Sequence, residues 1–185
     1  MYVSTRLPVL AAAVLAVSAA SLSAPPASAE LRHAVAARGT AQPQGPKGIG
    51  TFEDWTAATY DEAGQPICYA FVRASNSVPA IPGRPKGVLT VTERPNSRDS
   101  VAISAGFRYA QGAEVTVQIE QSAFRFYTAG SSAFARDGAA AVAAFQKGRQ
   151  VVARSPGPRG ATITDTFSLR GFSQAYQAIT RACSR

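Results

Sequence analysis

The chain has 185 residues, with 19 Lys plus Arg against 11 Asp plus Glu, a formal net charge of +8 and two cysteines. Charged residues make up only 16% of it, whereas glycines number 15 and prolines 12. This balance is typical of a mainly β, turn-rich protein and excludes a collagen, a coiled coil and a disulfide-knotted mini-protein.

Residues 1–29 have the features of a cleavable secretory signal peptide. Arg6 precedes an apolar run from Leu7 to Ala20, and Ala27-Ser28-Ala29 forms a small-x-small cleavage site before Glu30. The run is shorter than the roughly 20 residues that span a bilayer, so we expect no transmembrane segment after cleavage. No Arg-Arg pair precedes it and no cysteine follows it, which favours the general secretory route to the periplasm, the cell surface or the medium.

Residues 30–50 show no hydrophobic period and contain Pro43 and Pro46, so we predict a flexible linker there. His33, the single histidine, lies in this linker, far from any nucleophile that it could activate. The folded domain is predicted to cover residues 51–185.

Alternating and β-branched residues predict a series of short strands in this domain. They begin with an extended run from Thr51 and continue over residues 67–72, 88–93, 101–107, 114–119, 124–128, 149–154 and 162–167. The strands over 88–93 and 101–107 flank a turn at residues 95–99 and should form a hairpin, and the last two should pair as neighbours. Residues 75–86, with three prolines, are predicted to form an exposed loop.

Two helices are expected among these strands. Asp137 is a candidate N-cap for a short alanine-rich helix that stops at Gly148. A C-terminal helix is predicted with Ser168 as its N-cap, because apolar side chains then recur at spacings of three and four. These side chains are Leu169, Phe172, Tyr176, Ile179 and Cys183.

The two cysteines are expected to form one disulfide. Cys183 lies on the apolar stripe of the last helix, and Cys68 shares a strand face with Ala70 and Val72. A helix packed on the sheet and joined to it by Cys68–Cys183 satisfies both patterns, and a paired set of cysteines is the usual state in an exported protein.

The positive charge is the one feature that suggests a ligand class. Arginine supplies 16 of the 19 basic residues, and its planar fork binds phosphate, sulfate and carboxylate groups. Arg94, Arg98 and Arg108 flank the predicted hairpin and are the candidates for an anion-binding face. Because no run of basic residues occurs, we expect weak binding of anionic lipid or glycan and no dedicated nucleic-acid surface.

Catalysis, metal binding and cofactor binding have no candidate residues. No His and Cys cluster with ligand spacing and no calcium-loop pattern occurs. The glycine-rich piece Gly157-Pro-Arg-Gly160 lacks the lysine of a phosphate-binding loop. The sequence therefore predicts no catalytic residue, no metal and no cofactor.

Several segments together resemble the invasion associated locus B family of Gram-negative bacteria. They are Phe52-x-Asp54-Trp55-Thr56, Cys68-Tyr69-Ala70-Phe71, Ser131-Ser-Ala-Phe-Ala-Arg-Asp-Gly138, and Phe167-Ser-Leu-Arg-Gly-Phe172 with Ala175 and Cys183. The resemblance implies an exported envelope protein with an immunoglobulin-like β-sandwich, linked in pathogenic relatives to host-cell entry and to surface or stress adaptation, and it supplies no catalytic site.

Three function classes remain open. A non-catalytic binding or structural module of the envelope, with an unidentified envelope or host protein as its partner, fits the signal peptide and the single disulfide. A polyanion-binding factor would need a clustered basic face. A hydrolytic enzyme would have to work with Ser, Asp and Arg alone.

Overall fold

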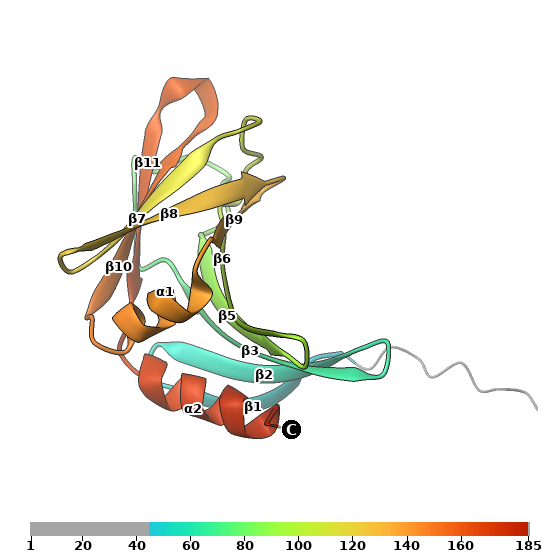
Figure 1. The fold of residues 1–185 in the computed structure, drawn as a ribbon. Helices are drawn as coiled ribbons and strands as arrows, with labels where there is room; N and C mark the ends of the chain where they lie inside the picture. The colour runs from blue at the N-terminus through green and yellow to red at the C-terminus, as the bar shows by residue number, and fades with distance from the viewer. Residues whose placement is uncertain (1–44, 185) are drawn as a thin grey trace, which may run out of the picture. The chain divides into compact units, whose positions relative to one another are not determined.

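The structure, a computed structural model, describes residues 45–184; the predicted signal peptide and residues 30–44 of the predicted linker lie outside them. Within these residues, 11 strands form one antiparallel sheet and two helices lie against it (Figure 1). The strands are β1 Lys47–Phe52, β2 Trp55–Glu62, β3 Gln65–Arg73, β4 Asn76–Val78, β5 Val88–Arg94, β6 Ser97–Ser104, β7 Glu114–Ile119, β8 Ser122–Ala129, β9 Ser132–Ala135, β10 Gln150–Pro156 and β11 Thr162–Ser168. The helices are α1 Gly138–Phe145 and α2 Phe172–Ala182.

The sheet curls until its two ends meet. Its strand order is β1-β2-β3-β5-β6-β9-β8-β7-β10-β11-β4, so β4 follows β3 in the chain and yet pairs with β11 at the other end of the order. The link between β3 and β4 joins the two parts of the sheet, because Ala74 N–H donates to the Gly87 carbonyl just before β5 and Ser75 N–H donates to the Thr166 carbonyl of β11, each at 2.8 Å. Figure 1 shows β7, β8, β10 and β11 in one layer and β1 to β3 in another, with β5 and β6 between them. The predicted mainly β, sandwich-like class is confirmed.

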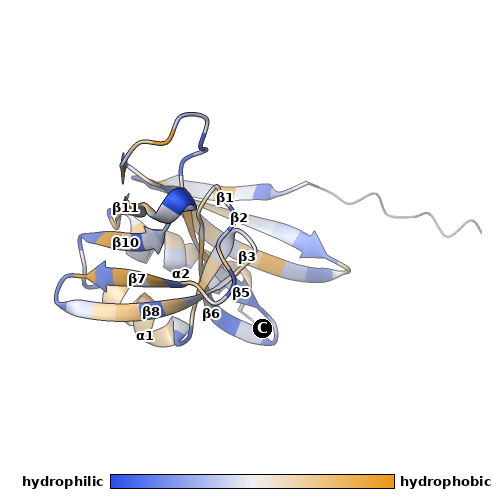
Figure 2. Cartoon of the chain, turned by 90° about the horizontal axis from the view of Figure 1, so that it is seen from above, coloured by the Kyte–Doolittle hydropathy of each residue, from blue (hydrophilic) through white to orange (hydrophobic). Residues whose placement is uncertain are grey.

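Strand alternation decides which side chains enter the core. In β7, which has the predicted bounds, Val115 and Val117 are fully buried while Thr116 between them is exposed. Figure 2 shows the alternation of hydrophobic and hydrophilic residues along β7 and β8.

Helix α2 lies on the inner face of β1, β2, β3 and β5. Its Phe172 is fully buried against Trp55 and Phe145, with ring centroids 4.8 and 5.4 Å away.

Both predicted helices are present, but α1 ends at Phe145, before the predicted stop at Gly148, and one predicted N-cap is wrong. The Asp137 carboxylate accepts from Ala140 N–H at 2.9 Å and caps α1 as expected. Ser168, however, is the last residue of β11, and α2 begins at Phe172 after Gly171. Gly171 has φ 82°, and a Cβ there would lie 2.0 Å from the Phe52 carbonyl oxygen, so only glycine fits this start.

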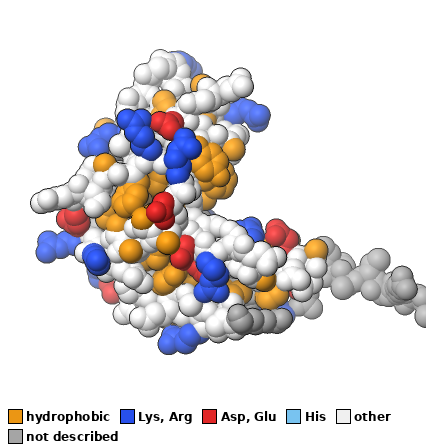
Figure 3. All heavy atoms as spheres, viewed as in Figure 1, with side chains coloured by type: hydrophobic (Ala, Val, Ile, Leu, Met, Phe, Trp, Pro, Cys, Tyr) orange, Lys and Arg blue, Asp and Glu red, His pale blue; other side chains and the backbone are white. Residues whose placement is uncertain are grey.

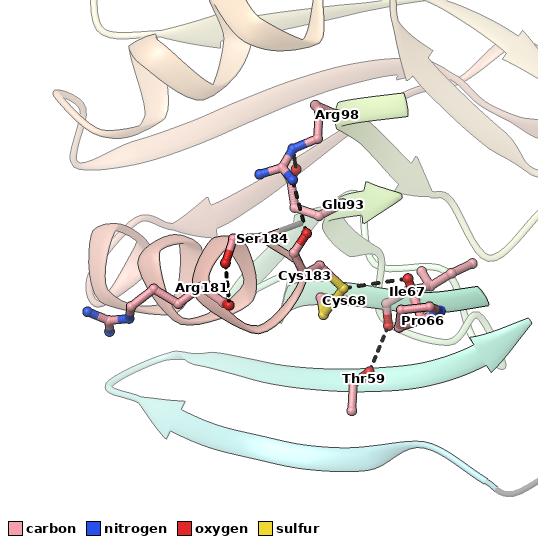
Figure 4. The surroundings of a disulfide bond; sticks show 9 residues. All are labelled: Thr59, Pro66, Ile67, Cys68, Glu93, Arg98, Arg181, Cys183 and Ser184. Atoms are coloured by element: carbon pink, nitrogen blue, oxygen red, sulfur yellow. Dashed lines mark hydrogen bonds and ion pairs between the residues drawn. A yellow bond between two sulfur atoms is a disulfide. The ribbon is translucent and has the colours of Figure 1, made fainter. Parts of the chain in front are cut away.

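The predicted disulfide is confirmed (Figure 4). Cys68 on β3 and Cys183 just after α2 are bonded, with their Cα atoms 5.9 Å apart and 115 positions apart in the chain. The bond joins the end of α2 to the strand face that also carries Ala70 and Val72.

Four strands differ clearly from the sequence-based expectation. Strand β1 begins at Lys47, before the expected start at Thr51; its glycines hide any alternation, and pairing with β2 fixes it. The polar β4 lies inside the segment predicted to be a loop, and β9 was not predicted at all. Strand β6 runs from Ser97 to Ser104, so the hairpin turn is shorter than residues 95–99 and Phe107 lies outside the strand.

Candidate functional site

The three arginines predicted to bind anions do not form one site. Arg94 faces the Glu62 carboxylate at 3.6 Å, and Arg98 forms an ion pair with Glu93 and donates to the Cys183 carbonyl at 3.2 Å (Figure 4). Both lie at the β5–β6 turn. Arg108 follows the opposite end of β6, past Ser104, where its side chain is exposed. The length of β6 separates Arg108 from the other two, so the three side chains do not lie side by side, and anion binding by them stays a prediction.

Other arginines are also held by carboxylates. Arg125 and Arg136 both donate to Glu114, at 2.9 and 2.8 Å, and these hydrogen bonds lower the pKa of Glu114, with Arg136 contributing most. Arg170 donates to Glu53 at 3.0 Å. Figure 3 shows Lys and Arg side chains scattered over this face of the molecule, several of them beside Asp or Glu.

A buried carboxylate lies next to the disulfide. Glu93 is fully buried on β5 opposite Cys68 and accepts from Asp99 N–H at 3.1 Å. Burial raises the pKa of Glu93 despite this hydrogen bond and the nearby Arg98. Tyr176 of α2 donates to the Asp99 carboxylate at 2.6 Å, and burial together with this bond raises the pKa of Tyr176 to about 12. These contacts among Glu93, Asp99 and Tyr176 therefore link α2 to the β5–β6 hairpin.

A second buried polar cluster anchors the loop before β5. Arg84 donates through both terminal nitrogens to Asp165 of β11, at 2.9 and 2.6 Å, and its Nε donates to the Ala105 carbonyl at 2.7 Å. The two side chains are only 5% and 1% exposed. Ser77 of β4 also donates to Asp165. Nothing in the local sequence indicated this pair, because 81 positions separate its members.

An open hollow lies where the two ends of the sheet meet. We call it the seam groove; its volume is about 370 Å³, and it lies between β2, the end of β3 and the end of β11. Its lining residues are Asp54, Thr56, Phe71, Val72, Arg73, Ala74, Ser75, Lys86 and Ser168. A second hollow of about 270 Å³ shares Ala74, Ser75 and Lys86 with it, so the two lie next to each other.

The sequence contained part of the signal for this groove. Phe71 and Arg73 lie two positions apart on the outward face of β3, opposite the buried Ala70 and Val72, and the alternation alone predicts that they share a face. The contribution of Lys86 was missed, because its position depends on how the proline-rich loop returns to β5.

The ionisable groups do not suggest a metal centre. Among residues 45–184, no three His, Cys, Asp or Glu side chains lie close enough together to hold an ion. Neither helix in this part of the chain is long and apolar enough to cross a membrane.

Comparison with known proteins identifies the family. The model of the invasion associated locus B (IalB) protein family matches residues 55–180, which is more than half of the chain. The chain belongs to the invasion associated locus B family. A search of curated proteins finds no match.

A solved structure of this type supports the family's fold. The crystal structure of invasion associated protein B from Bartonella henselae is similar, with a TM-score of 0.53 and 16% sequence identity. The match covers 72% of this chain and 95% of the Bartonella chain. Neither the family's description nor the name of the solved relative refers to an enzymatic reaction. The overall fold is thus similar to that of invasion associated protein B from Bartonella henselae.

Proposed function

We propose that residues 30–185 act, after export, as a non-catalytic binding or structural module of the cell envelope, in the periplasm or at the cell surface, with a part in host interaction or envelope stress. Family membership supports a protein of the invasion associated type. The signal-like segment 1–29 supports export.

The proposed binding role rests on the presence of the seam groove. It is open, and its side chains can stack, donate hydrogen bonds and form ion pairs: an aromatic ring, hydroxyls, two cations and one carboxylate. Such a mixture of one apolar surface and a few polar groups is typical of ligand sites.

The location is tested by fractionating cells that express the full chain. We expect the mature protein in the periplasmic, surface or medium fraction, with Glu30 as its first residue. Ala29→Phe, which places a bulky side chain at the cleavage site, should leave an uncleaved precursor, and Ser23→Ala inside the leader is the control. An uncleaved wild-type chain in the cytosol would contradict the proposal.

A second candidate function is binding of a polyanion. The net charge of +8 favours it. So does the presence of Arg73 and Lys86 in one groove, in place of the three arginines that the sequence indicated.

A further inference from the structure

Arg73 and Lys86 are neighbours because of the register between β3 and β5. Arg73 pairs with Val88, and the Ala74 N–H donates to the Gly87 carbonyl, so the next position toward the loop brings Lys86 beside Ser75. Position 86, two residues before β5 begins, therefore lies diagonally across from Arg73 on the outward face, at a separation that long side chains can bridge.

Six of the 12 arginines among residues 45–184 form ion pairs, and Arg73 and Lys86 are among the basic residues that do not. Neither forms an ion pair within residues 45–184, whereas Arg94, Arg98 and Arg125 each contact a carboxylate. Two exposed, like charges held side by side repel each other. An anion that binds between them removes this repulsion and gains two charge-assisted contacts.

Phe71 gives the groove an apolar floor. Its ring stacks on Tyr69 with the centroids 6.1 Å apart, and it remains half-buried in the outward face. Phe71 pairs with Thr56 on one side, and Ser168 lines the groove near β11, so hydroxyls surround the ring. A sugar ring has an apolar C–H face and a hydroxyl edge, and it fits this combination of an aromatic floor with polar walls.

The two adjacent hollows favour a ligand longer than a single ion. Lys86 lines both, and the second hollow adds Asn76 and Ser77 beyond it. The charge of Arg84, which also lines the second hollow, is already neutralised by Asp165. The positive charge is thus concentrated at Arg73 and Lys86, which outnumber the single carboxylate of the seam groove, Asp54.

We propose that the seam groove binds an acidic glycan, with a sulfate or carboxylate between Arg73 and Lys86 and a sugar ring over Phe71. The proposal names the ligand of the binding module and so rests on the proposed function.

The test uses the mature chain and a sulfated oligosaccharide of the heparin type, with its desulfated form as the comparison. The double variant Arg73→Gln/Lys86→Gln should weaken binding about tenfold and lower the salt dependence of the affinity, because two charge contacts are lost. Phe71→Thr should also weaken binding but leave the salt dependence unchanged, because it removes only the ring. Equal thermal midpoints among the variants confirm that each is folded.

A matched control removes the same charge elsewhere. Lys147→Gln/Arg159→Gln changes two exposed residues that form no ion pair within residues 45–184 and do not line the groove. It should leave the affinity near that of the wild type. An equal loss in both double variants would overturn the proposal in favour of a general effect of net charge.

Two other results would also overturn it. Groove-dependent binding to vesicles containing anionic phospholipid, without glycan binding, would assign the groove to a lipid surface. Absence of glycan binding at low salt would exclude the acidic glycan, while the location of the mature chain, measured separately, would still decide the proposed function.

Discussion

One buried ion pair in this domain holds a loop that has no regular secondary structure. The loop over residues 79–87 has few backbone partners, and the Arg84–Asp165 pair holds it against β11. The guanidinium also lies over the Phe107 ring, 5.3 Å from its centroid. A charged pair of this kind is costly to bury, and its value depends on both partners being present.

Asp165→Ala should therefore destabilise the domain strongly. It leaves the Arg84 guanidinium buried without its carboxylate, which costs about 3–5 kcal/mol. Urea unfolding of the mature chain measures the loss. Glu62→Ala removes an exposed partner of Arg94 and should change stability by about 0–1 kcal/mol. A similar, small effect in both variants would show that the buried pair is not a structural anchor.

Glu93 should make stability depend on pH. Because burial raises its pKa in the folded state, the folded protein binds this proton more tightly than the unfolded chain does. The contribution of Glu93 to stability should therefore be greatest below its unfolded pKa and fall as the pH rises through its folded pKa.

Glu93→Gln isolates this effect, because glutamine keeps an acceptor for Asp99 N–H and does not titrate. The free energy of unfolding of the wild type minus that of the variant should decrease from acid toward neutral pH, since other groups cancel in the difference. A difference that stays constant or increases with pH would contradict the assignment.

Among the strands and helices, the sequence predicted those in which the spacing of apolar residues matches the spacing of the buried side chains. Strand β7 alternates without interruption, and the stripe that includes Phe172 and Ile179 places α2 on the core. Strand β4 has no such spacing of apolar residues, because its mainly polar residues form a strand only by pairing with β11. The seam groove could be predicted only in part, because it forms where β11 lies beside β3. No local pattern in the sequence indicates that these two distant strands come together.

The packing of helix α2 on the sheet should depend mainly on the Phe172 ring. Phe172→Ala removes a fully buried ring between Trp55 and Phe145 and should cost about 3–5 kcal/mol in the free energy of unfolding. Chemical denaturation provides the measurement, with the exposed Gln174→Ala on the same helix as the control. A loss no larger than that of the control would mean that α2 packs through other side chains.

For the whole molecule, the disulfide is the longest covalent constraint within residues 45–184. It closes a loop of 115 residues that contains β4 to β11 and most of β3, with β1 and β2 outside it. In the chain-entropy model such a loop destabilises the unfolded state by up to about 4–5 kcal/mol, and strain or residual structure reduces this value.

Cys183→Ser should therefore lower the thermal midpoint clearly while the circular dichroism of the sheet stays unchanged. Reduction of the wild type should give a similar loss, and the same reductant should not alter the variant. If the reduced wild type and the variant both melt at the midpoint of the oxidised protein, the bond contributes nothing to stability.

The spacing of the two cysteines also orders events during synthesis. Cys68 precedes Cys183 by 115 positions, so Cys68 is made well before its partner. Until the two meet, the Cys68 thiol is an unpaired nucleophile, and exchange with other thiols is open to it. A mixed disulfide on Cys68 therefore marks a chain in which Cys183 has not yet paired with it.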